Sequence, residues 1–133
     1  MPMFRKDPEK AARAAAAAAA SAAEAARLKA ISRVDLAVEL LPGLGLSGTT
    51  RVAGQWGVPV RRLISWQMRP FSPFYQYSEL FDAFTEAIKL LVNANLVERR
   101  IEENQVHWCA TGAGEDAIRQ RSAKDILTRP EIF

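Results

Sequence analysis

The stretch from Leu96 to Ile118, LVERRIEENQVHWCATGAGEDAI, decides how the fold is interpreted. It contains valine, isoleucine and tryptophan, which favour β-strands. We therefore expect residues 96–101 and 105–110 to pair as a hairpin across the sequence EEN. Thr111 is predicted to begin a helix that continues to about Leu127. The stretch thus places two short strands, a turn and the start of a helix in direct succession.

An amphipathic helix is predicted immediately before the hairpin, over residues 79–94. Ser78 suits its N-cap, and Asn95 is a residue type that can end it in the left-handed conformation. Apolar residues recur there at intervals of three and four, which gathers them on one face. They are Leu80, Phe81, Phe84, Ala87, Ile88 and Leu91.

The segment from Glu86 to about Gln120 resembles the second half of winged helix-turn-helix proteins of the MarR/PadR type. In that family a helix ends in a short Gly-Leu-Val step, and a charged wing follows. The chain then enters a helix through an aliphatic-Thr-x-x-Gly-x-x-Ala pattern. Here the step is ANLVERR, and the second pattern spans Ala110 to Ala117. The resemblance implies a winged helix-turn-helix domain, mainly α with a small β-hairpin wing. Winged helices act in transcription factors, but also in protein complexes that never contact DNA.

A long Ala-rich N-terminal helix precedes this domain. Alanine has the highest helix propensity, so residues 7 to about 30 predict one helix, with Asp7 as a cap and Pro8 at its first position. Leu28 is the single large aliphatic side chain there, which leaves little to bury against a core. We expect a helical arm over residues 1–30. Such an arm either projects from the domain or packs closely against another copy or a partner.

The composition changes at Ile31, where large aliphatic residues begin to appear at helical spacing in ISRVDLAVELL. Pro42 and the glycines after it are expected to end that helix. We place the winged-helix domain at residues 31–126 and a short C-terminal tail at residues 127–133.

Residues 49–56 and 59–68 predict two short helices joined at Gly57, in a pattern similar to a helix-turn-helix. The segment 49–69 is basic and contains no acidic residue. Its arginines, with interleaved Gln55, Ser65 and Gln67, suit phosphates and bases. The candidate DNA-binding residues are Arg51, Arg61, Arg62, Ser65, Gln67 and Arg69, with Arg99 and Arg100 of the wing as a second contact.

The helix before the wing has the wrong charge for the family's DNA-binding version. This helix contains three acidic residues and one basic residue, which give it a net charge of −2. They are Glu79, Asp82, Glu86 and Lys89. A helix that faces phosphates should be basic. We therefore expect the helix at 59–68 to be the main DNA-reading element. The alternative is that its arginines are solvated, with their stems covering nearby tryptophans.

The residues that enzymes and metal sites require are scarce in this sequence. His107 and Cys109 are too few ligands for a metal site, and PGLGLSG lacks the lysine and spacing of a P-loop. We expect no enzyme activity, no cofactor and no metal. A lone cysteine, with neither a signal peptide nor a long apolar run, indicates a cytoplasmic protein.

Two functions fit these features. A net charge of +3 permits a polyanionic partner without demanding one. In the first interpretation the protein binds double-stranded DNA as a small transcriptional regulator, dimeric because short DNA readers usually need two half-sites. In the second it is a protein-interaction or assembly module of a phage or bacterial complex that does not bind DNA. Residues 71–94 would then be the docking surface, and the Ala-rich helix would contact a partner or another copy.

Overall fold

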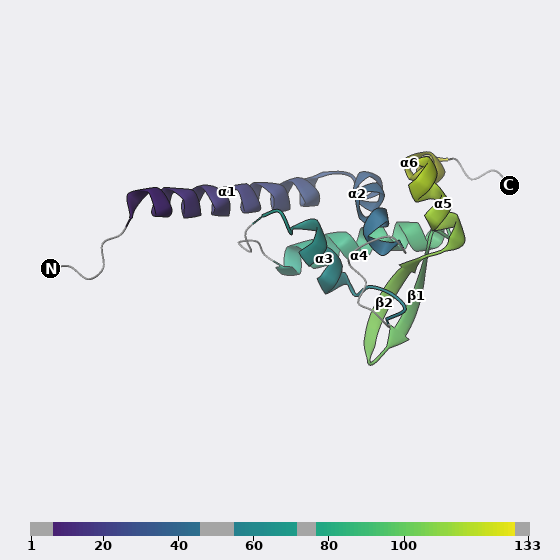
Figure 1. Cartoon of the computed structure of the whole chain (residues 1–133). Helices are drawn as coiled ribbons and strands as arrows, with labels where there is room; N and C mark the ends of the chain where they lie inside the picture. The colour runs from purple at the N-terminus through teal and green to yellow at the C-terminus, as the bar shows by residue number, and fades with distance from the viewer. Residues whose placement is uncertain (1–6, 46–54, 72–76, 130–133) are drawn as a thin grey trace.

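The computed structural model describes residues 7–45, 55–71 and 77–129, which are mainly helical with a two-stranded antiparallel hairpin (Figure 1). In chain order the elements are α1 (Pro8–Ala30), α2 (Arg33–Leu40), the 3-10 helix η1 (Leu41–Leu44), α3 (Val60–Gln67), α4 (Tyr77–Asn93), β1 (Val97–Glu102), β2 (Gln105–Ala110), α5 (Gly112–Gln120) and α6 (Ala123–Thr128). The long N-terminal helix and the hairpin are therefore where the sequence predicts them.

Helix α1 begins as predicted, with the Asp7 carboxylate accepting a hydrogen bond from the Glu9 amide and Pro8 in the first turn. Its N-terminal part extends beyond the rest of the chain (Figure 1). Its C-terminal part joins the core, because Leu28 is fully buried and α1 packs against α4. Ser21 and Ala25 are buried on the same part of the helix, and Arg27 and Lys29 form ion pairs with Glu39 of α2 and Glu79 of α4. The last turns of α1 are therefore anchored, although the preceding turns are mostly exposed.

Helix α4 is the element around which the core is built. It contacts α1, α2, α3 and β1. Its predicted apolar face is buried at Leu80, Phe84, Ala87, Ile88 and Leu91.

Two details of the α4 prediction are wrong. Phe81 is 40% exposed, because it lies about 100° around the helix from Leu80, at the edge of the buried stripe. Ser78 lies inside the helix, which already begins at Tyr77, so it is not the N-cap. The left-handed Asn95, with φ of 60°, is confirmed.

The hairpin has the predicted strands to within one residue. Val97 pairs with Ala110 at its base and Glu102 with Gln105 at its tip. Glu103 and Asn104 form the turn, both with positive φ, as a type I′ hairpin turn requires.

Val58 forms an isolated bridge to the outer edge of β2, exchanging two backbone hydrogen bonds of 2.8 and 2.9 Å with Trp108. The neighbouring Gly57, where the sequence predicts the junction of two helices, lies in a bend before this bridge. A Cβ atom at Gly57 would lie 2.7 Å from the carbonyl oxygen of Trp108, so glycine is needed there for close backbone approach.

The predicted single helix from Thr111 to about Leu127 is wrong, although Thr111 does cap its start by accepting from the Gly114 amide. Helix α5 ends at Arg121, which is left-handed with φ of 52°, and α6 follows in a new direction. The break brings α6 against α2, where Lys124 lies 3.1 Å from a carboxylate oxygen of Asp35. The hydrogen bond from Lys124 lowers the pKa of Asp35.

The helix expected at 59–68 is confirmed as α3, with Pro59 at its N-cap. The helix ISRVDLAVELL is also confirmed, as α2 capped by Ser32 and followed by η1. The other predicted helix, over residues 49–56, falls largely outside the described residues.

Two glycines of α5 offer a matched test of this packing. A Cβ atom on Gly114 would collide with the backbone carbonyl oxygen of Leu96, whereas one on Gly112 would meet no atom within 4 Å. We expect Gly114→Ala to lower the free energy of unfolding by about 1–3 kcal/mol through overpacking. Gly112→Ala should leave it unchanged or raise it by less than about 1 kcal/mol. Urea denaturation followed by circular dichroism measures both, and equal effects would contradict the packing of α5 on the hairpin.

Candidate nucleic-acid interface

A groove of about 630 Å³ lies between the start of α3, one face of α4 and the hairpin. We call it the α4–hairpin groove. Three cations line it, and none of its described lining residues is acidic. Its lining residues are Pro59, Val60, Arg61, Phe81, Thr85, Lys89, Val92, Asn93, Arg99, Gln105, Val106 and Trp108.

Helix α4 contributes a continuous stripe to this groove. Phe81, Thr85, Lys89 and Asn93 follow one another at intervals of four, so their side chains lie along one side of the helix. This stripe borders the buried face of α4 and remains open toward the hairpin. An exposed lysine and an exposed asparagine therefore stand on the same line as an exposed phenylalanine.

Two of the three acids of α4 lie on a different side of the helix. Glu79 forms an ion pair of 2.9 Å with Lys29 of α1, and Glu86 forms one of 2.7 Å with Arg33 at the start of α2. The third acid, Asp82, is exposed and lies seven residues before Lys89 on the same side of α4, but it does not line the groove. The net charge of −2 therefore describes the whole helix, and Lys89 is the charged residue that α4 contributes to the described lining. Lys89 was not among the candidate residues predicted from the sequence, because the net charge of the whole helix does not show that Lys89 lies on the groove side.

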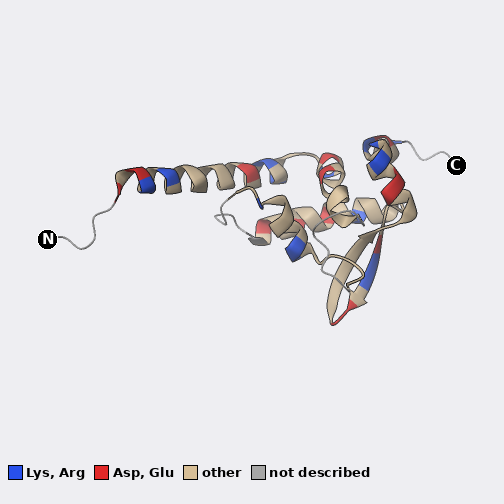
Figure 2. Cartoon of the chain, in the orientation of Figure 1, with Lys and Arg blue, Asp and Glu red and all other residues tan. Residues whose placement is uncertain are grey.

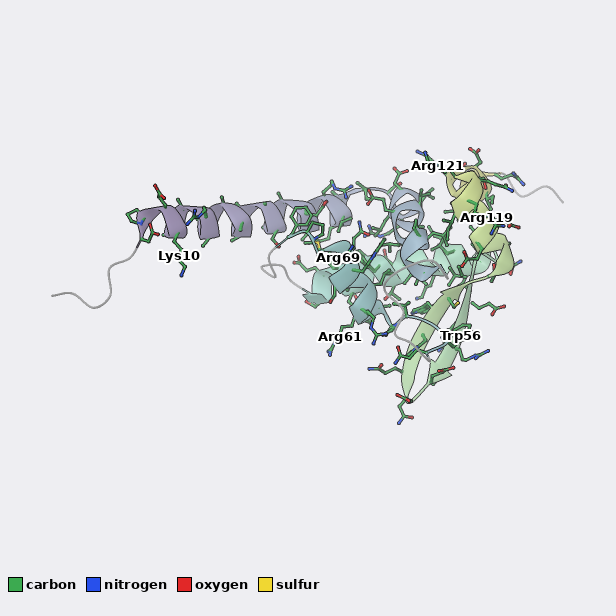
Figure 3. The ribbon with its side chains drawn as sticks, viewed as in Figure 1. Lys10, Trp56, Arg61, Arg69, Arg119 and Arg121 are labelled. Atoms are coloured by element: carbon green, nitrogen blue, oxygen red, sulfur yellow. The ribbon has the colours of Figure 1, made fainter. Side chains whose placement is uncertain are left out.

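Only part of the predicted DNA-reading helix reaches the groove. Arg61 lines it from the first turn of α3, while Arg69 lies at the opposite end of that helix (Figure 3). The guanidinium of Arg62 donates to the Gln55 side-chain oxygen at 2.6 Å and is held beside the segment that precedes α3. Ser65 and Gln67, exposed and half-buried respectively, are absent from the lining, and Arg51 lies outside the described residues.

The two wing arginines lie on opposite faces of the hairpin, because side chains alternate along a strand. Arg99 shares a face with its cross-strand neighbour Trp108 and lines the groove. The guanidinium of Arg100 instead lies 4.3 Å from the ring centroid of Trp56 and 3.4 Å from a carboxylate oxygen of Glu102. The structure therefore divides the predicted pair into one groove residue and one that packs on a tryptophan.

The basic side of the groove is shared by separate elements. Figure 2 shows positively charged residues on α3 and on β1, which the groove brings to one site with Lys89 of α4. Neither Lys89 nor Arg99 forms an ion pair with any residue that the structure describes. Their charges are consequently available to an anionic partner.

Comparisons with protein-family models, with curated proteins and with solved structures found no match to this chain.

Among the described residues, no group of three or more His, Cys, Asp and Glu side chains lies close enough together to hold a metal ion. His107 and Cys109 are buried on one face of β2. In the same part of the chain, no helix combines the length and the apolar character needed to cross a membrane.

Because Arg99 and Arg100 lie on opposite faces of the hairpin, their removal should affect stability differently. Arg100→Ala should lower the free energy of unfolding by about 0.5–1 kcal/mol, because it removes the cation–π contact with Trp56. Arg99→Ala should change it by less than about 0.5 kcal/mol, because that exposed side chain forms no ion pair or cation–π contact with the residues that the structure describes. Urea titration of both variants in the same buffer makes the comparison. Equal destabilisation, or a larger loss for Arg99→Ala, would contradict the placement of these two side chains.

Proposed function

We propose that this chain is a winged-helix protein that binds duplex DNA through the face around the α4–hairpin groove. Support for the fold comes from the order of the elements. Helix α2, the Val58 pairing, α3, α4 and the two strands follow one another as helix, short strand, helix, helix and hairpin. In a winged helix that order makes α4 the recognition helix and the β1–β2 turn the wing.

The observation that carries the proposal is the convergence of Arg61, Lys89 and Arg99 from three different elements on one face. The described lining residues of that face include no carboxylate to oppose them. Cations spread over separate elements can contact phosphates on both sides of a groove of DNA, and such contacts supply most non-specific affinity. We therefore propose α4, and not residues 59–68, as the main DNA-reading element, with Arg61 as a flanking contact.

The same face carries groups that can distinguish bases. Asn93 and Gln105 are exposed, and their amides can each pair with an adenine edge in the major groove. Thr85 lies between Phe81 and Lys89 on the α4 stripe and offers a hydroxyl. We propose that phosphate contacts orient the protein while these amides select sequence.

The biological setting that we propose is transcriptional regulation by a dimer. A face with three cations covers only a short site, and regulators of this size usually gain affinity by pairing two half-sites. The exposed N-terminal turns of α1 lie away from the groove and leave the DNA-binding face free in a dimer (Figure 1).

Fluorescence anisotropy with a labelled random-sequence duplex, at about 50 and 200 mM salt, tests the DNA-binding face. The wild-type protein should bind in the micromolar range at low salt and lose orders of magnitude of affinity at high salt. The triple variant Arg61→Ala, Lys89→Ala, Arg99→Ala should bind more weakly. Its plot of log affinity against log salt should be shallower by about 2–3, close to one unit for each lost phosphate contact.

The control removes three cations away from the groove, namely Lys10→Ala, Arg69→Ala and Arg121→Gln, which lie on α1, at the far end of α3 and after α5 (Figure 3). This variant has the same net charge as the triple groove variant but should retain most of the affinity and the salt slope. An equal loss in both variants would show a diffuse charge effect and would contradict the proposed face. Absence of binding by the wild-type protein at low salt would contradict DNA binding itself.

A further inference from the structure

The floor of the α4–hairpin groove is apolar, which contact with DNA phosphates does not require. Val92 and Val106 are half-buried in the groove, and Trp108 closes its base. Phe81 opens into it with 40% of its surface exposed. An exposed phenylalanine thus continues the apolar floor of the groove, and this apolar surface is open to a partner.

The length of the groove favours a helical occupant. Its α4 stripe runs from Phe81 to Asn93, which corresponds to about 18 Å along a helix axis. About three turns of a second helix would lie alongside it, with apolar residues at every third or fourth position directed onto the floor. The hairpin contributes the rest of the lining, including Arg99, Val106 and Trp108.

The charge of the groove selects the kind of helix. Arg61 stands at one wall, Lys89 on α4 and Arg99 on the hairpin, and the described lining residues include no carboxylate. Lys89 and Arg99 form no ion pair with any residue that the structure describes, so a basic or neutral helix would leave them without a countercharge. Glu and Asp on the flanks of an apolar stripe would supply that countercharge. Complementary charge of this kind steers association and suppresses wrong partners.

We propose that the α4–hairpin groove docks an acidic amphipathic helix of a partner protein. Its apolar residues cover Phe81 and the floor, and its carboxylates pair with Arg61, Lys89 and Arg99. The docking proposal depends only on the residues that line the groove and not on DNA binding. A further consequence, that the docked helix displaces DNA, rests on the proposed function, because the same three cations would hold the phosphates. The groove would then be the place where a partner protein controls access to DNA.

The test uses a panel of fluorescein-labelled peptides of about 14 residues, long enough for three to four helical turns. Each carries Leu, Ile, Phe or Met at every third or fourth position and Glu elsewhere. The controls are peptides of the same composition with the apolar stripe scrambled, and peptides with Lys in place of Glu. Anisotropy against the full chain, without DNA, should show micromolar binding of at least one acidic amphipathic peptide and at least tenfold weaker binding of its controls.

Two variants separate docking from a general effect of exposed apolar surface. Phe81→Ser should weaken peptide binding at least tenfold, because it removes the exposed aromatic side chain of the groove. Ile101→Ser is the matched control, because Ile101 is 64% exposed but does not line the groove, and it should leave peptide binding unchanged. Equal effects of the two variants, or equal binding of scrambled peptides, would overturn the docking proposal.

Adding the bound peptide to a preformed DNA complex separates the two proposals. Release of DNA by the acidic peptide, and not by its scrambled control, supports both. If no peptide of the panel binds while DNA does, the docking proposal is wrong and the DNA proposal stands. If a peptide binds through Phe81 while DNA does not bind, the docking proposal stands and the DNA proposal is wrong.

Discussion

Burial of one face of α4 is the constraint on which the rest of the structure depends. Leu80, Phe84 and Leu91 are fully buried, and α1, α2, α3 and β1 all pack against this helix. Burying side chains of this size supplies roughly 1.5–3 kcal/mol each, so the elements around α4 are not free to move from it independently. Because the neighbours cover that face, the side of α4 toward the hairpin remains open, and the groove forms there.

The ion pairs of α4 complete the division of its surface. Lys29 and Arg33 place Glu79 and Glu86 beside α1 and α2, away from the stripe that holds Lys89. Exposed pairs of this kind contribute little to stability, about 0–1 kcal/mol. Their effect is on the distribution of charge, since they neutralise two acids of a helix that would otherwise repel a polyanion. A helix with a net negative charge can therefore present a positive face.

Most of the elements could be predicted from the sequence, whereas the directions of individual side chains could not. Helical periodicity located α4, alanine propensity located α1, and the residue pattern around the turn located the hairpin. The left-handed break at Arg121 was missed although Ser122 and Asp125 form the Ser-x-x-Asp pattern of a helix start, because no Gly or Pro interrupts the helical pattern. The contact of α6 with α2 accompanies the break. Likewise, strand alternation requires Arg99 and Arg100 to point apart, but only the position of Trp56 determines which one faces the groove. The groove is a tertiary feature of three elements, so no single segment of the sequence could have indicated it.

The most direct measurement is a two-dimensional ¹H–¹⁵N NMR titration of the full chain with a short duplex at low salt. If DNA binds at the α4–hairpin groove, amide signals of the α4 stripe, the start of α3 and the groove face of the hairpin should shift together in fast exchange. Added salt should reverse these shifts. Signals from α5, α6 and the N-terminal turns of α1 should remain in place. Shifts concentrated on α1 or α5 with an unperturbed groove would contradict the account, because DNA would then bind to a surface that the packing of α4 does not create.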